Sequence, residues 1–174
     1  FTYTMVLIGS LALSGFPFLS GYYSKDVILE VALASYTVTS QFVFFIGTIT
    51  AFLTAFYSLR LLVLVFLVDF KGYKSTIIKV HDVEGHMAFS LGILAIGSIF
   101  SGYIAKDMFL GLGSDFFKNS IFILPENLKL VDAEFLPTDL KLLPIKWSLT
   151  GSVLGLIIYQ YFGNFIAEIK LSNF

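Results

Sequence analysis

Long stretches without charged side chains are the feature of this sequence that most restricts its fold. Residues 1–24, 31–59 and 147–167 contain no charged side chain, and residues 85–105 contain only His86. Each stretch reaches the length of about 20 apolar residues that a helix needs to cross a hydrocarbon core of about 30 Å. Lipid offers the backbone no hydrogen-bond partners, so we expect these stretches to be membrane-spanning helices.

Composition supports this interpretation and excludes several functions. Of the 174 residues, 57% are hydrophobic and 13% are charged, whereas soluble domains have roughly 25% charged residues. A net charge of −1 without a basic stripe argues against a nucleic-acid partner. The sequence has no cysteine, so a disulfide, a thiolate zinc site and an iron–sulfur ligand set are excluded. It also lacks a Gly-x-Gly-x-x-Gly motif, and we expect no cofactor in this chain.

The predicted fold class is all-α, a polytopic membrane bundle that forms one domain over residues 1–174. The four expected transmembrane segments are residues 3–35, 42–68, 87–104 and 145–166. Extramembrane loops are expected at 69–84 and 105–144, the second of which holds three of the four prolines. The shorter loop carries Lys71, Lys74 and Lys79, so the positive-inside rule places it on the cytoplasmic or matrix side.

The first segment is too long for a single straight crossing. As one helix, residues 3–35 would extend about 50 Å. Pro17 lacks a backbone N–H and disrupts a helix, and Gly15 and Gly21 permit non-helical backbone on either side of it. We therefore expect a discontinuous helix that breaks at Pro17, a pattern typical of transporter helices with ion sites near the midplane.

Two interpretations of Lys25 remain open. In the first, Lys25 marks the membrane surface and residues 27–35 lie along the interface. In the second, Lys25 lies inside the membrane. Residues 27–37 hold one charge, Glu30, and have no strong polar face. An interfacial helix requires such a face, which favours the intramembrane position.

An intramembrane Lys25 would have a predictable chemistry. Burial disfavours its charged form, whereas a nearby carboxylate favours that form, so a lysine held between the two can bind and release a proton. Asp26 and Glu30 are four residues apart and share one helical face. We therefore predict that Lys25, Asp26 and Glu30 form a proton relay.

For the other polar residues the sequence predicts less specific roles. Arg60 either extends its side chain to the interface or pairs with a neighbouring helix inside the membrane. His81 and His86 lie near Asp82 and Glu84, but the spacing fits no standard zinc pattern. We expect these four side chains to be solvated or to cap a helix, and we predict neither a metal site nor a catalytic residue.

The stretch from Gly9 to Asp26, GSLALSGFPFLSGYYSKD, closely resembles a family of antiporter-like subunits of respiratory complex I, the NADH-ubiquinone oxidoreductase chain 5 family. Its Ser-Lys-Asp motif is specific to the antiporter-like superfamily. Further stretches resemble the same family in order along the chain: residues 54–60, 95–102, 132–137 and 141–144. The combination points to chain 5, and the resemblance extends over nearly the whole sequence.

The resemblance implies a role for each matching residue. Lys25 aligns with the lysine of the family's broken helix, on the polar axis along which protons move, and Asp26 aligns with the acid beside it. Pro17 aligns with the helix-breaking proline, and Glu30 aligns where the family often has an acid. The family topology places the 69–84 loop on the matrix side, as the lysine count does.

The resemblance also implies a setting for the chain. It would be the C-terminal portion of a subunit of the proton-translocating NADH:ubiquinone reductase, in the mitochondrial inner membrane or, as a second possibility, a bacterial one. Its partners would be the remainder of the same subunit, other membrane-arm subunits and the bilayer. NADH, FMN, iron–sulfur clusters and ubiquinone would act elsewhere in the complex. Two alternatives remain: a subunit of a multisubunit cation/proton antiporter, and a structural anchor without a proton path.

Overall fold

The computed structural model describes residues 1–68, 73, 75, 78–111, 114, 116–117, 120, 122, 124–125 and 129–161. Within these residues the regular elements are all helices, which confirms the predicted all-α class. Parts of the expected loops at 69–84 and 105–144 fall outside the described residues, as do Lys71 and Lys74.

Three helical stretches of the described part are long and apolar enough to cross a membrane. The first is α3 (Val38–Leu62), which continues into the π-helical turn η2 (Val63–Leu67). The second is α5 (Gly85–Phe109). The third joins the short α7 (Thr138–Lys141) to α8 (Leu143–Tyr161). This arrangement confirms the polytopic helical membrane bundle.

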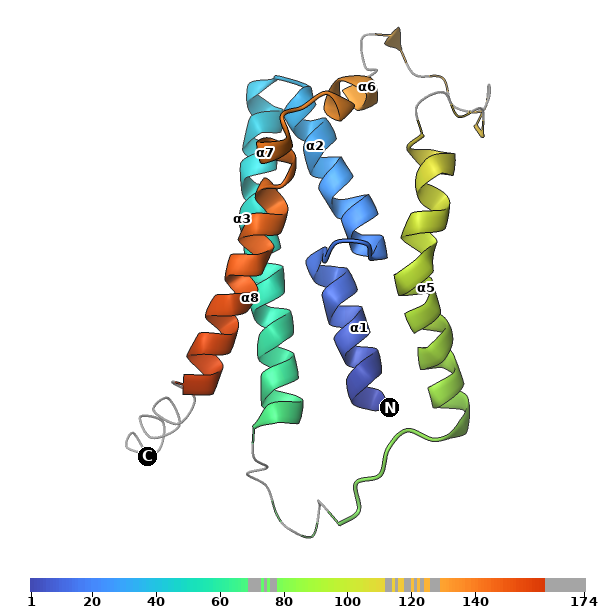
Figure 1. Cartoon of the computed structure of the whole chain (residues 1–174), viewed down its shortest axis with the longest axis vertical. Helices are drawn as coiled ribbons and strands as arrows, with labels where there is room; N and C mark the ends of the chain where they lie inside the picture. Colours follow the sequence, from blue (N-terminus) through green and yellow to red (C-terminus); the bar gives the residue numbers. More distant parts are fainter. Residues whose placement is uncertain are drawn as a thin grey trace.

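The first segment consists of two half-helices, as the sequence predicts. The apolar helix α1 (Thr2–Ser14) ends before Pro17, and the chain becomes helical again as η1 (Tyr22–Asp26) and α2 (Val27–Ala34). Figure 1 shows α1 and α2 stacked nearly end to end beside α3, with a short non-helical connection between them. The break lies at mid-height in the bundle (Figure 1), and α1 alone is too short to be counted among the membrane-spanning helices.

Close packing between α3 and α8 forms the largest helix–helix contact. A Cβ atom added to Gly151 of α8 would lie 2.5 Å from the backbone oxygen of Phe52, so only glycine permits this approach. One turn later, a Cβ on Gly155 would lie 3.4 Å from the Leu59 side chain. The GxxxG spacing on α8 therefore serves helix packing.

Helix boundaries differ most from the predicted ones at the start of α3 and the end of α5. Helix α3 begins at Val38 rather than residue 42, because the Thr37 hydroxyl and the Ser40 side chain form a capping box at its start. Helix α5 continues to Phe109, five residues past the predicted end. The predicted 105–144 loop also contains two short helices, α6 (Lys129–Glu134) and α7.

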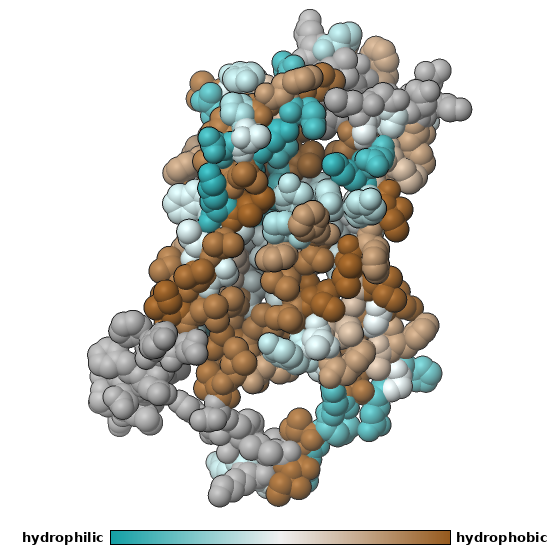
Figure 2. Space-filling view, viewed as in Figure 1, coloured by the Kyte–Doolittle hydropathy of each residue, from teal (hydrophilic) through white to brown (hydrophobic). Residues whose placement is uncertain are grey.

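Polar and apolar residues separate along the bundle. Figure 2 shows hydrophobic residues over much of the middle of the visible face and hydrophilic residues gathered toward its ends. Helices α6 and α7 lie at the same end as the α2–α3 connection (Figure 1), and the start of α1 lies toward the opposite end. This distribution is the one that a helical bundle in a bilayer requires.

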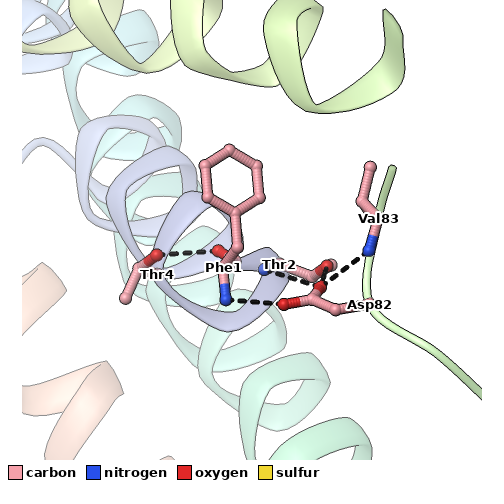
Figure 3. Close-up of polar contacts among 5 residues, drawn as sticks. All are labelled: Phe1, Thr2, Thr4, Asp82 and Val83. Carbon is pink, nitrogen blue, oxygen red and sulfur yellow. Dashed lines mark hydrogen bonds and ion pairs between the residues drawn. The ribbon is translucent and has the colours of Figure 1, made fainter. Parts of the chain in front are cut away.

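Asp82 ties the segment before α5 to the first turn of α1 (Figure 3). Its carboxylate accepts hydrogen bonds from the Thr2 N–H at 3.2 Å, the Val83 N–H at 2.9 Å and the Thr2 hydroxyl. The side chain acts here as a helix cap supplied by a distant segment.

Candidate functional site: the broken helix

The break begins with a specific helix-ending motif at Gly15. This residue adopts a left-handed conformation (φ 81°), and its N–H bonds to the carbonyl of Ala12 at 3.3 Å. The N–H of Phe16 bonds to the carbonyl of Leu11 at 3.1 Å, which completes a Schellman arrangement. Carbonyl groups that would otherwise be unpaired inside the membrane are therefore satisfied, and glycine is the residue that this backbone favours.

Gly21 has a different role from Gly15. Its backbone is helical (φ −63°), so it is not needed for conformational freedom. A Cβ atom at this position would lie 1.8 Å from the backbone oxygen of Ala12, closer than atoms can approach. The absence of a side chain at Gly21 therefore allows the second half-helix to start directly against the end of α1.

A second backbone feature of the break lies between the two glycines. Phe18 has a positive φ of 72° although it is not glycine, and its side chain is exposed within the described chain. Left-handed backbone is unfavourable for a bulky residue, and such conformations persist where the surrounding structure imposes them. No local signal in the sequence identifies this residue.

Lys25 and Asp26 both lie on the π-helical turn η1. Single π-helical turns within helices are frequent at functional sites. The Lys25 side chain is half-buried and reaches α3, where its Nζ donates a hydrogen bond to Thr54 Oγ1 at 3.0 Å. In the described part of the chain no ion pair joins Lys25 to Asp26. The lysine is therefore held by a neutral hydroxyl.

Asp26 is the most deeply buried charged residue of the site. Its relative exposure is 4%, and its carboxyl group lies against Gly15 at the end of α1. Among the described residues, its Oδ2 atom has no hydrogen-bond partner. Burying an unpaired carboxylate is costly. A neutral carboxyl group costs less to bury than a charged one, so this environment favours the protonated form of the side chain.

Glu30 lies one turn further along the same half-helix, in α2, and is partly buried. Its helix packs against α6, which carries Glu134. Lys141 and Glu134 form an ion pair of 3.8 Å at the end of the bundle where α6 and α7 lie. The structure thus places the three predicted relay residues on one half-helix, between the break and this end.

A cavity of about 160 Å³ lies beside the break, between α1, α3 and α8. Phe16 and Pro17 form part of its wall. Its walls are mostly apolar, but five serines from the three helices also line it: Ser10, Ser14, Ser58, Ser148 and Ser152. Each of these hydroxyls donates to a carbonyl three residues earlier in its own helix, which leaves the oxygen able to accept. The cavity has room for several water molecules.

Arg60 has a partner on a neighbouring helix. Its guanidinium lies over the ring of Tyr159 in α8, 5.7 Å from the ring centroid, within the range of a cation–π contact. The Arg60 side chain is otherwise exposed, so this contact is compatible with both predicted roles, pairing with a neighbouring helix and extension to the interface. No contact in the described chain links Arg60 to Lys25 or Asp26.

Sequence reasoning missed Thr54 and the serine-lined cavity. Thr54 lies 29 residues from Lys25, and only the packing of α3 against the broken helix brings the two together. No spacing rule links residues on separate helices, so the sequence carried no signal for this contact. His81 is exposed, and among the described residues no group of three acids and histidines gathers to hold a metal.

Comparison with known proteins identifies the family. The chain is 55% identical over 174 residues to NADH-ubiquinone oxidoreductase chain 5 of Phytophthora infestans, a match covering 100% of this chain and 26% of that protein. For the protein of the same name from Marchantia polymorpha, identity is 49% over 175 residues, with 100% and 26% covered. For that of Arabidopsis thaliana, identity is 45% over 174 residues, with 99% and 26% covered. No family model matches the chain.

The chain spans about a quarter of the length of these relatives. The matching region is a C-terminal part of them. Identities of 45–55% over essentially the whole chain, together with the helical membrane fold, leave no doubt about common ancestry. The chain belongs to the NADH-ubiquinone oxidoreductase chain 5 family.

Proposed function

We propose that this chain is part of a proton-translocating subunit in the membrane arm of NADH:ubiquinone oxidoreductase, and that Lys25 and Asp26 relay protons at the broken helix. One observation carries the proposal. A carboxyl group with 4% exposure, one oxygen of which has no hydrogen-bond partner among the described residues, lies at a helix break inside an apolar bundle, next to a half-buried lysine. Ionisable groups inside a membrane typically mark proton or ion paths.

The contacts of the two residues suit proton exchange. Lys25 is bound to a neutral hydroxyl, and within the described part of the chain neither Lys25 nor Asp26 has to break an ion pair before its protonation changes. A tight Lys–Asp pair in a low-dielectric interior would instead stabilise one fixed charge state. The neighbouring serine-lined cavity offers space for water, through which a proton can reach the break from the α1 side.

Glu30 extends the proposed path from the break. It lies one helical turn beyond Asp26, and the Lys141–Glu134 ion pair follows at the end of the bundle. A proton that leaves Asp26 along α2 would therefore meet a second carboxyl before it reaches exposed charged groups. This order supports a relay of three residues, in which Lys25 and Asp26 form the central step and Glu30 the outer one.

The activity belongs to a larger assembly. The relatives are named as subunits of an NADH-ubiquinone oxidoreductase and are about four times the length of this chain. We propose that the partners are the remainder of the same subunit and neighbouring membrane-arm subunits, in the mitochondrial inner membrane. Redox chemistry with NADH, FMN, iron–sulfur clusters and ubiquinone would occur elsewhere in the complex, and this chain would contribute titratable groups alone.

The test is Lys25→Met in the complete subunit within the assembled complex, because methionine keeps the length of the side chain and removes the charge. Lys79→Met is the matched control, since Lys79 is an exposed lysine in the segment before α5. Proton pumping and NADH oxidation are measured together. Loss of a positioned acid–base group slows proton transfer by about 10²–10⁴-fold. We therefore expect pumping to fall in the first variant and to stay at the wild-type level in the control.

Two results would contradict the proposal. Wild-type turnover and wild-type protons per NADH in an assembled Lys25→Met complex would assign the chain a structural role without a proton path. Sodium/proton exchange in membranes that lack the complex, lost in Lys25→Met, would instead assign it to a cation/proton antiporter.

A further inference from the structure

Thr54 of α3 makes two hydrogen bonds whose directions are fixed relative to each other. Its hydroxyl donates to the backbone carbonyl of Ala51 at 2.9 Å. The same oxygen accepts from Lys25 Nζ at 3.0 Å. Because the one hydroxyl proton is used by the helix backbone, the lone pairs of Thr54 face the lysine. Thr54 is thus set up as an acceptor for an amine.

This arrangement is particular to Thr54 among the neighbouring hydroxyls of α3. Thr48, Thr50 and Ser58 donate to carbonyls of their own helix at 2.7, 2.8 and 3.0 Å and make no other side-chain bond in the described chain. The backbone bond is therefore a common property of this helix. The second bond, to the broken helix, distinguishes Thr54.

The surroundings of Lys25 indicate what the bond to Thr54 does. Asp26 is the next residue along the chain and is buried, and its Oδ2 atom has no hydrogen-bond partner in the part of the chain that the structure describes. At short range in a poorly screened interior, an ammonium and a carboxylate attract each other strongly. Yet no ion pair joins them in the described chain, and the amine lies on α3. The Thr54 hydroxyl supplies the competing partner that a lysine in an apolar bundle needs.

We propose that Thr54 is a positioning residue for the proton relay, one that holds the Lys25 amine on α3 and keeps it from pairing with Asp26. This inference rests on the function proposed above. With the amine held by a neutral acceptor, Lys25 and Asp26 can each bind and release a proton. Without the hydroxyl, the amine loses its hydrogen-bond partner on α3 and turns to the neighbouring Asp26 carboxylate, and the resulting ion pair holds both groups in one charge state.

The experiment compares three substitutions in the complete subunit of the assembled complex. Thr54→Val keeps the shape of threonine and removes the hydroxyl, and Thr54→Ser keeps the hydroxyl. Serine makes the same backbone bond elsewhere on this helix, as Ser58 does with Ala55. Thr50→Val is the matched control, because Thr50 has the backbone bond on the same helix without a contact to Lys25.

The measured quantity is the part of proton pumping that Lys25→Met abolishes. We expect Thr54→Val to lower it about tenfold, the loss that corresponds to one hydrogen bond to a charged group. Thr54→Ser should stay within about twofold of wild type, and Thr50→Val should equal wild type. Rescue by serine separates positioning from packing, because serine lacks the methyl group that valine retains.

Several outcomes would overturn the inference. Wild-type pumping in Thr54→Val, or equal losses in the serine and valine variants, would exclude a positioning hydroxyl. Thr54→Ala serves as the second variant if valine prevents assembly. Failure of both to assemble, with Thr50→Val assembled, would make Thr54 a structural residue. Normal pumping in Lys25→Met would refute the proton relay itself, whereas normal pumping in Thr54→Val alone refutes only the role of Thr54.

Discussion

The close contact at Gly21 gives the sharpest structural prediction. In Gly21→Ala, the new Cβ atom would start 1.8 Å from the backbone oxygen of Ala12 and 3.0 Å from its carbonyl carbon. Both partners are backbone atoms, so no flexible side chain can move aside. The oxygen and the methyl group must separate by roughly 1.6 Å or more before they reach an ordinary contact of about 3.4 Å.

The two half-helices at the break have to move apart to give this separation. The start of η1 must move away from the end of α1, which stretches the hydrogen-bonded turn at Gly15 and shifts Asp26 against it. Overpacking of one methyl group in a well-packed site costs about 1–3 kcal/mol. We expect the upper end of that range, because the clash involves backbone on both sides.

The assay is the amount and thermal stability of assembled complex carrying Gly21→Ala. Gly9→Ala in α1 is the matched control, because a Cβ at Gly9 would have open space within 4 Å and alanine favours helix by about 1 kcal/mol. We expect reduced assembly and stability for the first variant and no loss for the second. Equal behaviour of the two variants would refute the steric account of the break.

A further prediction concerns the contact between α5 and the broken helix. In Gly102→Ala a Cβ would lie 2.5 Å from the Cα atom of Ser20, so α5 should loosen from the broken helix and the complex should be less stable. Gly97→Ala should be neutral because its space is open, and equal melting temperatures of the two variants would contradict this.

The fold class and the break were predictable because their causes are local. Runs without charged residues predict the membrane helices. Pro17 and Gly15 predict the break because each restricts or frees its own backbone. The Ser-Lys-Asp motif identifies Lys25 and Asp26 as candidate site residues from the sequence alone. These features need only neighbouring residues, which a sequence displays directly.

Features that depend on packing were not predictable. Thr54 became part of the site only when α3 packed beside the broken helix, and the steric role of Gly21 required the end of α1 to be in place. The short helices α6 and α7 lay in a stretch whose prolines indicated a loop. Phe18 shows the same limit, because the surrounding turn imposes its left-handed backbone.

Proton pumping by the assembled complex with Lys25→Met and Asp26→Asn combined tests the central claim most directly, because this variant leaves no titratable group on the η1 turn apart from its tyrosines. Both substitutions preserve side-chain size, and native electrophoresis verifies assembly. The account predicts that pumping falls, either through slower turnover or through fewer protons per NADH. Wild-type turnover together with wild-type protons per NADH would contradict it and assign the broken helix a structural role.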